Sequence, residues 1–349
     1  MSDSILPSHR IALLAELEQQ VQTLGFHRFG IVAVSPELTA QEQIMQTRLE
    51  HWLNQGHQAD MAWMANPKRQ DIRRVMPEVR SIICVALNYY TPHQRPEGVE
   101  YGKIARYGWG RDYHRVMHKK LKQLSLWLQD QETSEAQPIL ARYYADTGPV
   151  QDKFWAQEAG LGWVAKNGNV ITRDYGSWVF LGEVLTNLVL PPSQPHTNHC
   201  GTCTRCIEAC PTTAIRAPGV VDASRCIAYH TIENRSEHLP PPIAKHLNNW
   251  VAGCDICQDV CPWNQRFAQP TDVADFTPYP GNVAPKLEDL ATLSEPEWQQ
   301  KFPASALRRI KPAMWRRNAA AALSGQTLAE PEPEPKIDHS RGETTGHKQ

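Results

Sequence analysis

Apolar residues recur every three or four positions in several stretches of the chain, which is the spacing of one face of an α-helix. In the first stretch, residues 9–24, the shared face carries Ile11, Leu14, Leu17 and Val21. The same spacing predicts a long helix over residues 112–130, with Val116, Leu121, Leu124 and Leu128 inward. Shorter helices are expected over 42–56 and 150–159, and both end at or just before a glycine.

Apolar runs of a different kind predict strands near residues 28–34, 80–88, 139–144 and 178–188. The run at 80–88 is continuous, rich in β-branched residues and flanked by prolines, which is typical of a central strand. It contains Cys84, which we expect to be a small buried hydrophobic residue. Because helices and strands alternate up to about residue 190, this part of the chain is predicted to be an α/β domain.

A proline-rich segment, Pro191-Pro192-Ser193-Gln194-Pro195, interrupts this alternation and indicates a linker or stiff turn. We therefore expect an α/β domain over 1–190, a second domain over 191–268 and a helical segment over 269–325. The packing residues of the helical segment are expected to be Trp298, Phe302, Leu307, Ile310 and Trp315. Residues 326–349 carry too little apolar surface to fold and are expected to be disordered.

Composition and charge add few restrictions. The chain has 349 residues, of which 41% are hydrophobic and 21% charged, as in ordinary globular proteins. No export signal or membrane-length apolar run is visible, so we expect a cytoplasmic protein. The formal net charge of −1 gives no general attraction to nucleic acid. Basic residues gather at 103–122 and 308–317, but such stretches are usually solvated faces.

Eight of the nine cysteines lie between residues 200 and 261. The first run has the C-x2-C-x2-C-x3-C-P spacing of bacterial iron–sulfur proteins and consists of Cys200, Cys203, Cys206 and Cys210. The second run lacks its first cysteine and consists of Cys254, Cys257 and Cys261. Cys226 is the one unassigned cysteine nearby, and we expect it to fill this vacancy. The count then predicts two 4Fe–4S clusters and a reductive chemistry.

In two-cluster ferredoxins the fourth cysteine of each run ligates the other cluster. On that rule the first cluster is bound by Cys200, Cys203, Cys206 and Cys261. The second is bound by Cys210, Cys226, Cys254 and Cys257. A pair of structural zinc sites is the competing interpretation, although zinc ligands usually come as separated C-x2-C pairs. A disulfide framework would require a secreted context, of which the sequence shows no sign.

Motifs outside the cysteine region occupy residues 106–114, 144–150 and 159–167. No dinucleotide or nucleoside triphosphate signature accompanies them. Asp112-Tyr113-His114 begins a corrin-binding motif, but Met117 replaces its glycine, so we expect no histidine ligand below a cobalt ion. Asp146 follows a predicted strand, at the end where open α/β sheets bind ligands. The alternative is that Asp146 caps the next helix or forms an Asx turn.

Taken together, these motifs resemble those of the epoxyqueuosine reductase family. The resemblance runs from about residue 10 to about 320 and rests on residues 106–114, 146–149, 159–163, 176–178, 226–233, 253–264 and the first cysteine run. It implies a monomeric cytoplasmic enzyme with cobalamin and two 4Fe–4S clusters. The reaction it implies reduces epoxyqueuosine to queuosine at the wobble position of tRNA, the last step of queuosine biosynthesis.

The same resemblance implies a fold like that of reductive dehalogenases. It would comprise a cobalamin-binding α/β domain, a ferredoxin-like two-cluster domain and a short helical C-terminal part. Many family members carry a longer repeat region at that end, where this chain stops. That part of any tRNA contact is therefore in question for this chain.

Carried over residue by residue, the resemblance makes Asp146 the proton donor, which requires a raised pKa. We expect burial beside the corrin, without a cationic partner, to raise it. The cobalamin contacts fall on Arg69, Ala105, Asp146, Gln151, Val170, Leu181, Ala228, Asp255 and Ile256. Ala228 stands where the family usually has serine.

Two partners are implied as well. One is a tRNA anticodon stem-loop carrying epoxyqueuosine, for which the two basic stretches, with Arg235 and Lys245, are candidate phosphate contacts. The other is an external one-electron donor of the flavodoxin or ferredoxin type. Two competing functions remain: a corrinoid reductive dehalogenase, which usually carries an export signal, and an electron-transfer protein without its own catalysis. The latter would leave the α/β domain without a role.

Overall fold

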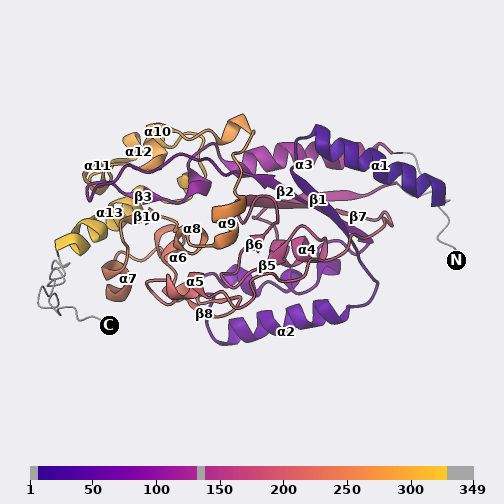
Figure 1. Cartoon of the computed structure of the whole chain (residues 1–349), viewed down its shortest axis with the longest axis horizontal. Helices are drawn as coiled ribbons and strands as arrows, with labels where there is room; N and C mark the ends of the chain where they lie inside the picture. Colours follow the sequence, from indigo (N-terminus) through magenta and orange to yellow (C-terminus); the bar gives the residue numbers. More distant parts are fainter. Residues whose placement is uncertain (1–6, 132–137, 328–349) are drawn as a thin grey trace, which may run out of the picture.

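The computed structural model describes residues 7–131 and 138–327, so nearly all of the predicted disordered tail lies outside the described residues. The helices of the first half of the chain are α1 (Pro7–Thr23), α2 (Ala40–Asn54), α3 (Tyr113–Gln129) and α4 (Asp152–Glu158). Its main strands are β1 (Arg28–Ala33), β2 (Ser81–Asn88), β4 (Ala141–Tyr144) and β7 (Val179–Thr186). All eight elements were predicted, with ends shifted by a few residues. Strands β1, β2 and β7 and helices α1, α3 and α4 lie in the right-hand part of Figure 1.

The ends shift where capping decides them. Helix α2 begins two residues before the apolar pattern does because Thr39 and Glu42 form a capping box, each side chain bonding the other's backbone N–H. This Thr-x-x-Glu signal is readable in the sequence. Helix α4 is shorter than expected and begins after Gln151.

The main sheet has the strand order β1-β2-β7-β4, and every neighbouring pair is antiparallel. Strand β2 is buried at all eight positions, as a central strand should be. Its side chains alternate between two cores because successive residues point to opposite faces. Ile83 and Val85 pack against α1 and α3, whereas Ile82 and Cys84 pack against α4. Figure 1 shows α1 and α3 on one side of the sheet and α4 and α2 on the other.

The antiparallel pairing corrects one expectation. The rule that ligands bind at the carboxyl ends of strands applies to parallel sheets, so it does not explain the position of Asp146. The structure places this residue after β4, which pairs only with β7 and forms an edge of the sheet. The loop after an edge strand is free to turn away from the sheet.

A small hairpin connects the sheet region to the cysteine-rich region. It consists of β5 (Trp163–Val164) and β6 (Val170–Ile171), and its tip is formed by residues 165–169. Gly162, just before β5, lies against the backbone of β6: a Cβ atom there would approach the Ile171 carbonyl oxygen to 2.1 Å. The close approach explains why glycine stands at this position of the 159–167 motif.

Short elements make up the cysteine-rich region. Its helices are α5 (Arg205–Glu208), α6 (Ile227–Ile232), α7 (Pro241–Lys245), α8 (Ile256–Asp259) and α9 (Pro262–Phe267). Its strands are β8 (Ile215–Ala217), β9 (Val220–Val221) and β10 (Trp250–Ala252). Strand β10 pairs in parallel with β3 (Lys103–Ile104), so a segment of the first half of the chain is built into this region.

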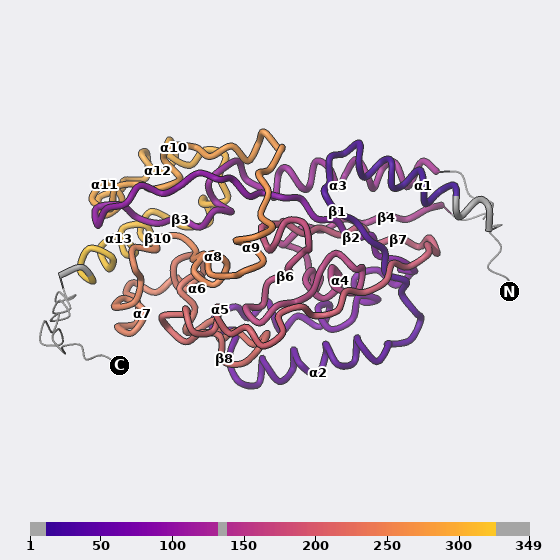
Figure 2. Tube along the Cα trace, in the orientation of Figure 1, coloured from indigo at the N-terminus to yellow at the C-terminus, as the bar shows by residue number. Residues whose placement is uncertain are grey.

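The C-terminal segment is helical, as predicted, with α10 (Pro280–Val283), α11 (Leu287–Ala291), α12 (Glu295–Lys301) and α13 (Pro312–Thr327). Its five predicted packing residues are all buried, and Phe302 stacks on Trp315 with ring centroids 4.9 Å apart. The core they form also includes Ile104 and Val251. The helical segment is therefore anchored to strands β3 and β10, as the tube in Figure 2 shows for these elements.

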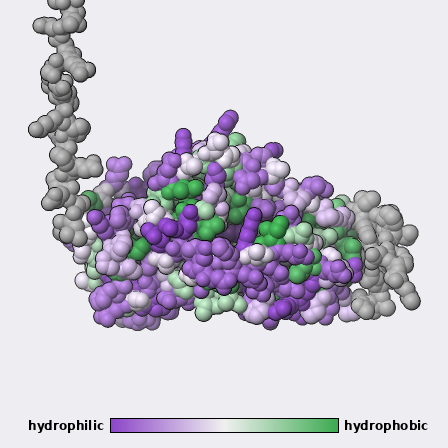
Figure 3. All heavy atoms as spheres, turned by 90° about the horizontal axis from the view of Figure 1, so that it is seen from below, coloured by the Kyte–Doolittle hydropathy of each residue, from purple (hydrophilic) through white to green (hydrophobic). Residues whose placement is uncertain are grey.

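The face of the molecule seen in Figure 3 is mostly hydrophilic, with hydrophobic residues gathered in a few patches near its middle. Across residues 7–131 and 138–327, none of the helices combines the length and the apolar character needed to cross a membrane.

Candidate functional site

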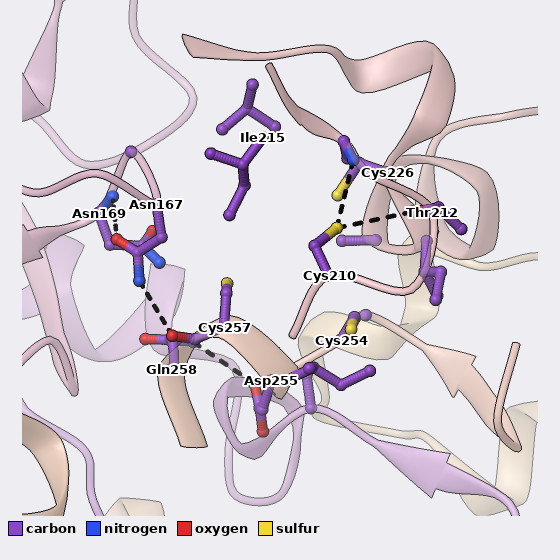
Figure 4. Close-up of a pocket in the computed structure, with 18 of the residues that line it drawn as sticks. Asn167, Asn169, Cys210, Thr212, Ile215, Cys226, Cys254, Asp255, Cys257 and Gln258 are labelled. Carbon is purple, nitrogen blue, oxygen red and sulfur yellow. Dashed lines mark hydrogen bonds between the residues drawn. The ribbon is translucent and has the colours of Figure 1, made fainter. Parts of the chain in front are cut away.

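The eight clustered cysteines surround two separate cavities. Cys200, Cys203, Cys206 and Cys261 line a cavity of about 130 Å³, which we call the first cysteine cavity. Cys210, Cys226, Cys254 and Cys257 line a cavity of about 460 Å³, the second cysteine cavity. Figure 4 shows these four side chains entering the second cavity from different segments of the chain. The structure thus brings together the two sets of four that the crossed-ligand rule assigns.

Local structure places each set. Helices α5 and α8 carry Cys206 and Cys257, and Cys203 and Cys254 lie just before the N-caps of these helices, so that each x2-spaced pair of cysteines spans one short turn. Cys261 immediately precedes α9, and Pro262 occupies the first position of that helix. Val251, where the second run lacks a cysteine, is buried in strand β10, and Cys226 enters from the start of α6 instead. Nowhere in the described ranges do three His, Cys, Asp or Glu side chains form a group suited to a single metal ion.

Backbone N–H groups point at several of the sulfur atoms. The N–H of Ala214 lies 3.2 Å from the Cys210 sulfur. Burial raises the pKa of Cys226, and N–H groups at the start of α6 act against this rise. Burial likewise raises the pKa of Cys261, against N–H groups from the start of α9. Helix N-termini favour negative charge, so these donors suit thiolates bound to a cluster.

The second cysteine cavity also contains four of the nine predicted cobalamin contacts: Ala105, Ala228, Asp255 and Ile256. Small residues leave its wall open. Gly253, for example, has a positive φ of 72°, and a Cβ atom there would meet the Ala105 side chain at 2.6 Å. The serine hydroxyl usual at position 228 is absent, so Ala228 offers the cavity only a methyl and its backbone.

The other five predicted contacts do not line this cavity. Arg69 is buried, and its guanidinium donates to the carbonyl oxygens of Gly148 (2.8 Å) and Val150 (3.0 Å). Gln151 precedes α4, and Val170 and Leu181 pack in the core on the α4 side of the sheet. Asp146 and Gln151 are the two ends of the segment 146–151, which we call the acid loop. Arg69 bonds this loop, and Val150 of the loop belongs to the same core as Val170 and Leu181.

Asp146 makes contacts that the sequence did not predict. It accepts hydrogen bonds from the Tyr113 hydroxyl (2.8 Å) and from His114 Nε2 (3.1 Å), and the other ring nitrogen of His114 bonds Asp112 (2.8 Å). Its φ of 59° lies in the left-handed region, which is strained for a residue other than glycine. The helix-capping alternative is wrong, because α4 begins after Gln151.

The expected pKa of Asp146 is also wrong in direction. The side chain is 59% exposed, so the expected burial is not found either. Desolvation by the surrounding protein acts to raise the pKa, but the hydrogen bonds from His114 and Tyr113 outweigh it, and the pKa lies below its ordinary value. For His114, burial lowers the pKa, but the two carboxylates outweigh it and raise the pKa to about 9. At neutral pH the proton shared between His114 and its two carboxylate partners therefore resides on His114. The Asp-Tyr-His motif, read from sequence as a broken corrin signature, supplies a partner for Asp146 instead.

A second pair of carboxyl groups consists of Glu183 and Asp152, which directly follows the acid loop. Glu183, on β7, is fully buried, and neither of its carboxyl oxygens has a conventional hydrogen-bond partner. Burial and the neighbouring carboxylate of Asp152 raise the pKa of Glu183 well above its ordinary value. Burial also raises the pKa of Asp152, to about 6. Such a pair holds a shared proton near neutral pH, and sequence reasoning treated Glu183 only as a break in an apolar run.

A buried ion pair fixes the wall of the second cavity. The carboxylate of Asp255 accepts hydrogen bonds from Arg95 (2.9 Å) and from the backbone N–H of Arg106 (2.8 Å). Arg95 is itself stacked between Trp250 and Trp109, 4.6 and 5.0 Å from the ring centroids. Burial nevertheless raises the pKa of Asp255 to about 6. Nothing in the sequence near Arg95 signals this role.

A row of tyrosines connects the cavity with the acid loop. Tyr107 lines the second cysteine cavity, and its ring lies 6.2 Å from that of Tyr113, centroid to centroid. Tyr113 in turn bonds Asp146. Tyr107 and Tyr113 thus connect the wall of the second cysteine cavity with the acid loop.

Comparisons with known proteins agree with this arrangement. A family model described as epoxyqueuosine reductase QueG, DUF1730, matches residues 69–147, and one described as 4Fe-4S double cluster binding domain matches residues 199–264. The chain is 65% identical over 294 residues to an epoxyqueuosine reductase of Synechocystis sp., covering 84% of this chain and 99% of that protein. It is 51% identical over 313 residues to that of Atelocyanobacterium thalassa, covering 90% and 100%.

Solved structures give the same result. A crystal structure of epoxyqueuosine reductase with a tRNA-Tyr epoxyqueuosine-modified stem loop superposes with a TM-score of 0.82 at 30% identity, over 90% of this chain and 82% of that one. An epoxyqueuosine reductase from Bacillus subtilis, described as having its catalytic aspartate loop swung out of the active site, gives a TM-score of 0.75 at 29% identity, with the same two coverages.

Proposed function

Because the chain belongs to the epoxyqueuosine reductase family, we propose that it reduces epoxyqueuosine in tRNA to queuosine at the site formed by the second cysteine cavity and the acid loop. One observation carries the proposal: a four-cysteine set lines a cavity of about 460 Å³, and Tyr107 and Tyr113 connect this cavity with the carboxylate of Asp146. The reaction consumes two electrons and two protons, releases the epoxide oxygen as water and leaves a carbon–carbon double bond. The molecule must therefore deliver electrons and protons to one place.

The two cysteine sets fit two 4Fe–4S clusters. Each set surrounds a cavity, and the match to a double-cluster domain spans all eight cysteines, from Cys200 to Cys261. N–H donors directed at Cys210, Cys226 and Cys261 complement the negative charge of thiolate ligands. We assign Cys200, Cys203, Cys206 and Cys261 to the first cluster and the other four to the second.

We place the cobalamin at the larger cavity, next to the cysteines of the second cluster. Small residues in the cavity wall leave room for a cofactor; they are Ala105, Ala228 and Gly253. Asp255 and Ile256, which also line the cavity, lie in sequence between the cluster ligands Cys254 and Cys257. When bound, cobalamin supplies electrons at low potential to the epoxide carbon. Arg69 acts at a distance from the cavity wall, because its hydrogen bonds to two carbonyl groups hold the acid loop in place.

Protons come from the group centred on His114. The proton is held on His114 Nε2, which faces the Asp146 carboxylate, while Asp112 holds the other ring nitrogen. Transfer across the 3.1 Å hydrogen bond gives Asp146 the neutral acid form, and this carboxyl then donates to the epoxide oxygen. Asp146 is thus the proton donor, and His114 is the group that recharges it.

The RNA partner is an anticodon stem-loop carrying epoxyqueuosine. Of the two basic stretches, 308–317 is occupied within the protein: Arg309 pairs with Glu233, and Arg317 donates to three backbone carbonyl groups. Arg235 is also engaged, with the Arg309 carbonyl. Helix α3 instead presents three exposed cations that suit phosphates: Arg115, Lys119 and Lys122. They continue along the helix whose first residues contact Asp146.

Electrons enter from an external donor of the flavodoxin or ferredoxin type. The entry point is the first cluster, because Cys203 is the one cysteine of the described eight that is classed as exposed. Cys210, Cys226, Cys254 and Cys257 would hold the second cluster at the large cavity, where it would supply electrons to the cofactor. The protein works as a monomer in the cytoplasm, where its RNA substrate is found.

Anaerobically reconstituted protein provides the decisive experiment. It is incubated with tRNA from a strain unable to complete queuosine synthesis, together with a chemical reductant, and the nucleosides are analysed by mass spectrometry. We expect epoxyqueuosine to lose one oxygen atom and become queuosine. Unchanged epoxyqueuosine in a sample with full iron, sulfide and cobalamin would refute the proposal, and turnover of a halogenated aromatic compound instead would favour a dehalogenase.

A further inference from the structure

The hairpin formed by β5 and β6 lies between the two cysteine cavities. Asn167, at its tip, lines both cavities, and its side-chain amide donates to the Cys257 carbonyl oxygen at 3.2 Å. Figure 4 shows Asn167 and Asn169 opposite Cys257 and Gln258. The tip therefore belongs to the first half of the chain but touches the ligand loops of both clusters. The proposed function gives it no role.

Two lysines accompany this tip, one at each cavity. Lys166 lines the first cysteine cavity, and its ammonium donates to the carbonyl oxygens of Gly201 (2.7 Å) and Cys203 (2.9 Å). Lys153, from the first turn of α4, lines the second cavity, and its ammonium donates to the Gly168 carbonyl (2.7 Å) and to Asn169 (3.4 Å). Each ammonium is thus fixed by backbone carbonyl groups at the wall of a different cavity.

The positions of these charges have an electrostatic consequence. Reduction of a 4Fe–4S cluster adds one electron, and so one negative charge, to a group already negative from its four thiolates. A fixed cation nearby favours the reduced form, and it does so more strongly where water is excluded. Lys153 lies within electrostatic reach of Cys257 and Cys226 at the second cavity, whereas Lys166 is held at the first cavity by the Gly201 and Cys203 carbonyl oxygens.

We propose that Lys166 and Lys153 set the reduction potentials of the first and second clusters separately, and that the hairpin tip holds both charges in place. The inference rests on the two clusters assigned above but not on the identity of the RNA substrate. Both lysines are positioning residues, since they act on the clusters and not on the substrate. A higher potential at the second cluster directs electrons inward from the first.

The test is a redox titration of the full-length protein with both clusters, followed by electron paramagnetic resonance. Lys153→Gln is expected to disfavour reduction of the second cluster about ten-fold, which corresponds to a fall in its reduction potential of about 59 mV for one electron. Lys166→Gln is expected to disfavour reduction of the first cluster about three-fold. Lys153→Arg and Lys166→Arg retain the charge and should restore most of each shift. Lys119→Gln, on the exposed face of α3, is the matched control and should change neither potential.

Several outcomes would overturn the proposal. Potentials in Lys153→Gln equal to those in Lys119→Gln would show that the charge has no effect. Equal shifts in the Gln and Arg variants would show a structural role. If Lys153→Gln loses iron, the same titration is carried out on Lys153→Met, which also removes the charge. Loss of iron in both variants would show that Lys153 has a structural role. Because potentials are read without tRNA, failure here is distinguishable from failure of the proposed reaction.

Discussion

In the proposed reaction the cysteine-rich region supplies electrons and the acid loop supplies protons, and the two regions are built in different ways. In the cysteine-rich region, ligands a few residues apart are placed by single helical turns such as α5 and α8. At the acid loop, Asp146 depends on His114, which is 32 residues away in sequence and comes from a separate helix. Electron delivery thus relies on local geometry, whereas proton delivery relies on tertiary contacts. Changes on the two sides should therefore have separable effects.

Removing a cysteine of the second cluster should have the largest effect. Cys226→Ser is expected to lose the second cluster, roughly halving iron and sulfide per chain, and to abolish epoxyqueuosine reduction. Iron and sulfide analysis with the nucleoside assay measures both. Cys84→Ser is the control: Cys84 lies in the sheet core away from both cavities, so it should keep all its iron. Full iron content in Cys226→Ser would contradict the assignment.

Replacing Asp146 should affect proton delivery and leave the clusters and cobalamin unchanged. Asp146→Asn removes the acid but keeps the size of the side chain, and we expect kcat to fall by about 10²–10⁴-fold, the usual contribution of a general acid. Iron, sulfide and the cobalamin absorption spectrum should remain as in the unmodified protein. A variant that turns over at the original rate would exclude Asp146 as the proton donor.

The pH profile tests His114. Its pKa, about 9, lies above the ordinary value of 6.5, so the charged form stabilises the fold fully below pH 6.5 and this contribution is lost as the pH rises through 9. Activity should decline over the same upper limb. His114→Gln should lower kcat roughly ten-fold and remove that limb, because its side chain does not titrate. An unchanged alkaline limb in the variant would assign it to another group.

The smallest effect is expected at Glu183. Its raised pKa means that ionising it in the folded protein is unfavourable, so its contribution to stability is present at low pH and is lost as the pH rises. Glu183→Gln resembles the protonated form and should raise Tm by a few degrees at pH 8 while changing it little at pH 4.5. Thermal unfolding at the two pH values measures this. An equal change at both would indicate a packing effect and no titration.

Much of the fold followed from the sequence because its signals are local. The continuous apolar run of β2 predicted a central strand, and all its positions are buried. Helical spacing predicted α1 and α3, whose Leu17 and Leu121 are buried in one core, whereas the side chain of Ile11 lies outside the described residues. Antiparallel pairing was not foreseen, since strand direction depends on how the connections cross the sheet.

The sequence by itself indicated the family and the two sets of four cysteines, because both rest on motifs whose internal spacing is fixed along the chain. Only the tertiary structure decided where the proton resides, since His114, Asp152 and Glu183 acquire their pKa values from neighbours distant in sequence. It likewise decided that Arg95 binds Asp255 across 160 positions. Spacing fixes which atoms are able to meet within one turn, whereas burial and opposing charge exist only after distant segments have packed together.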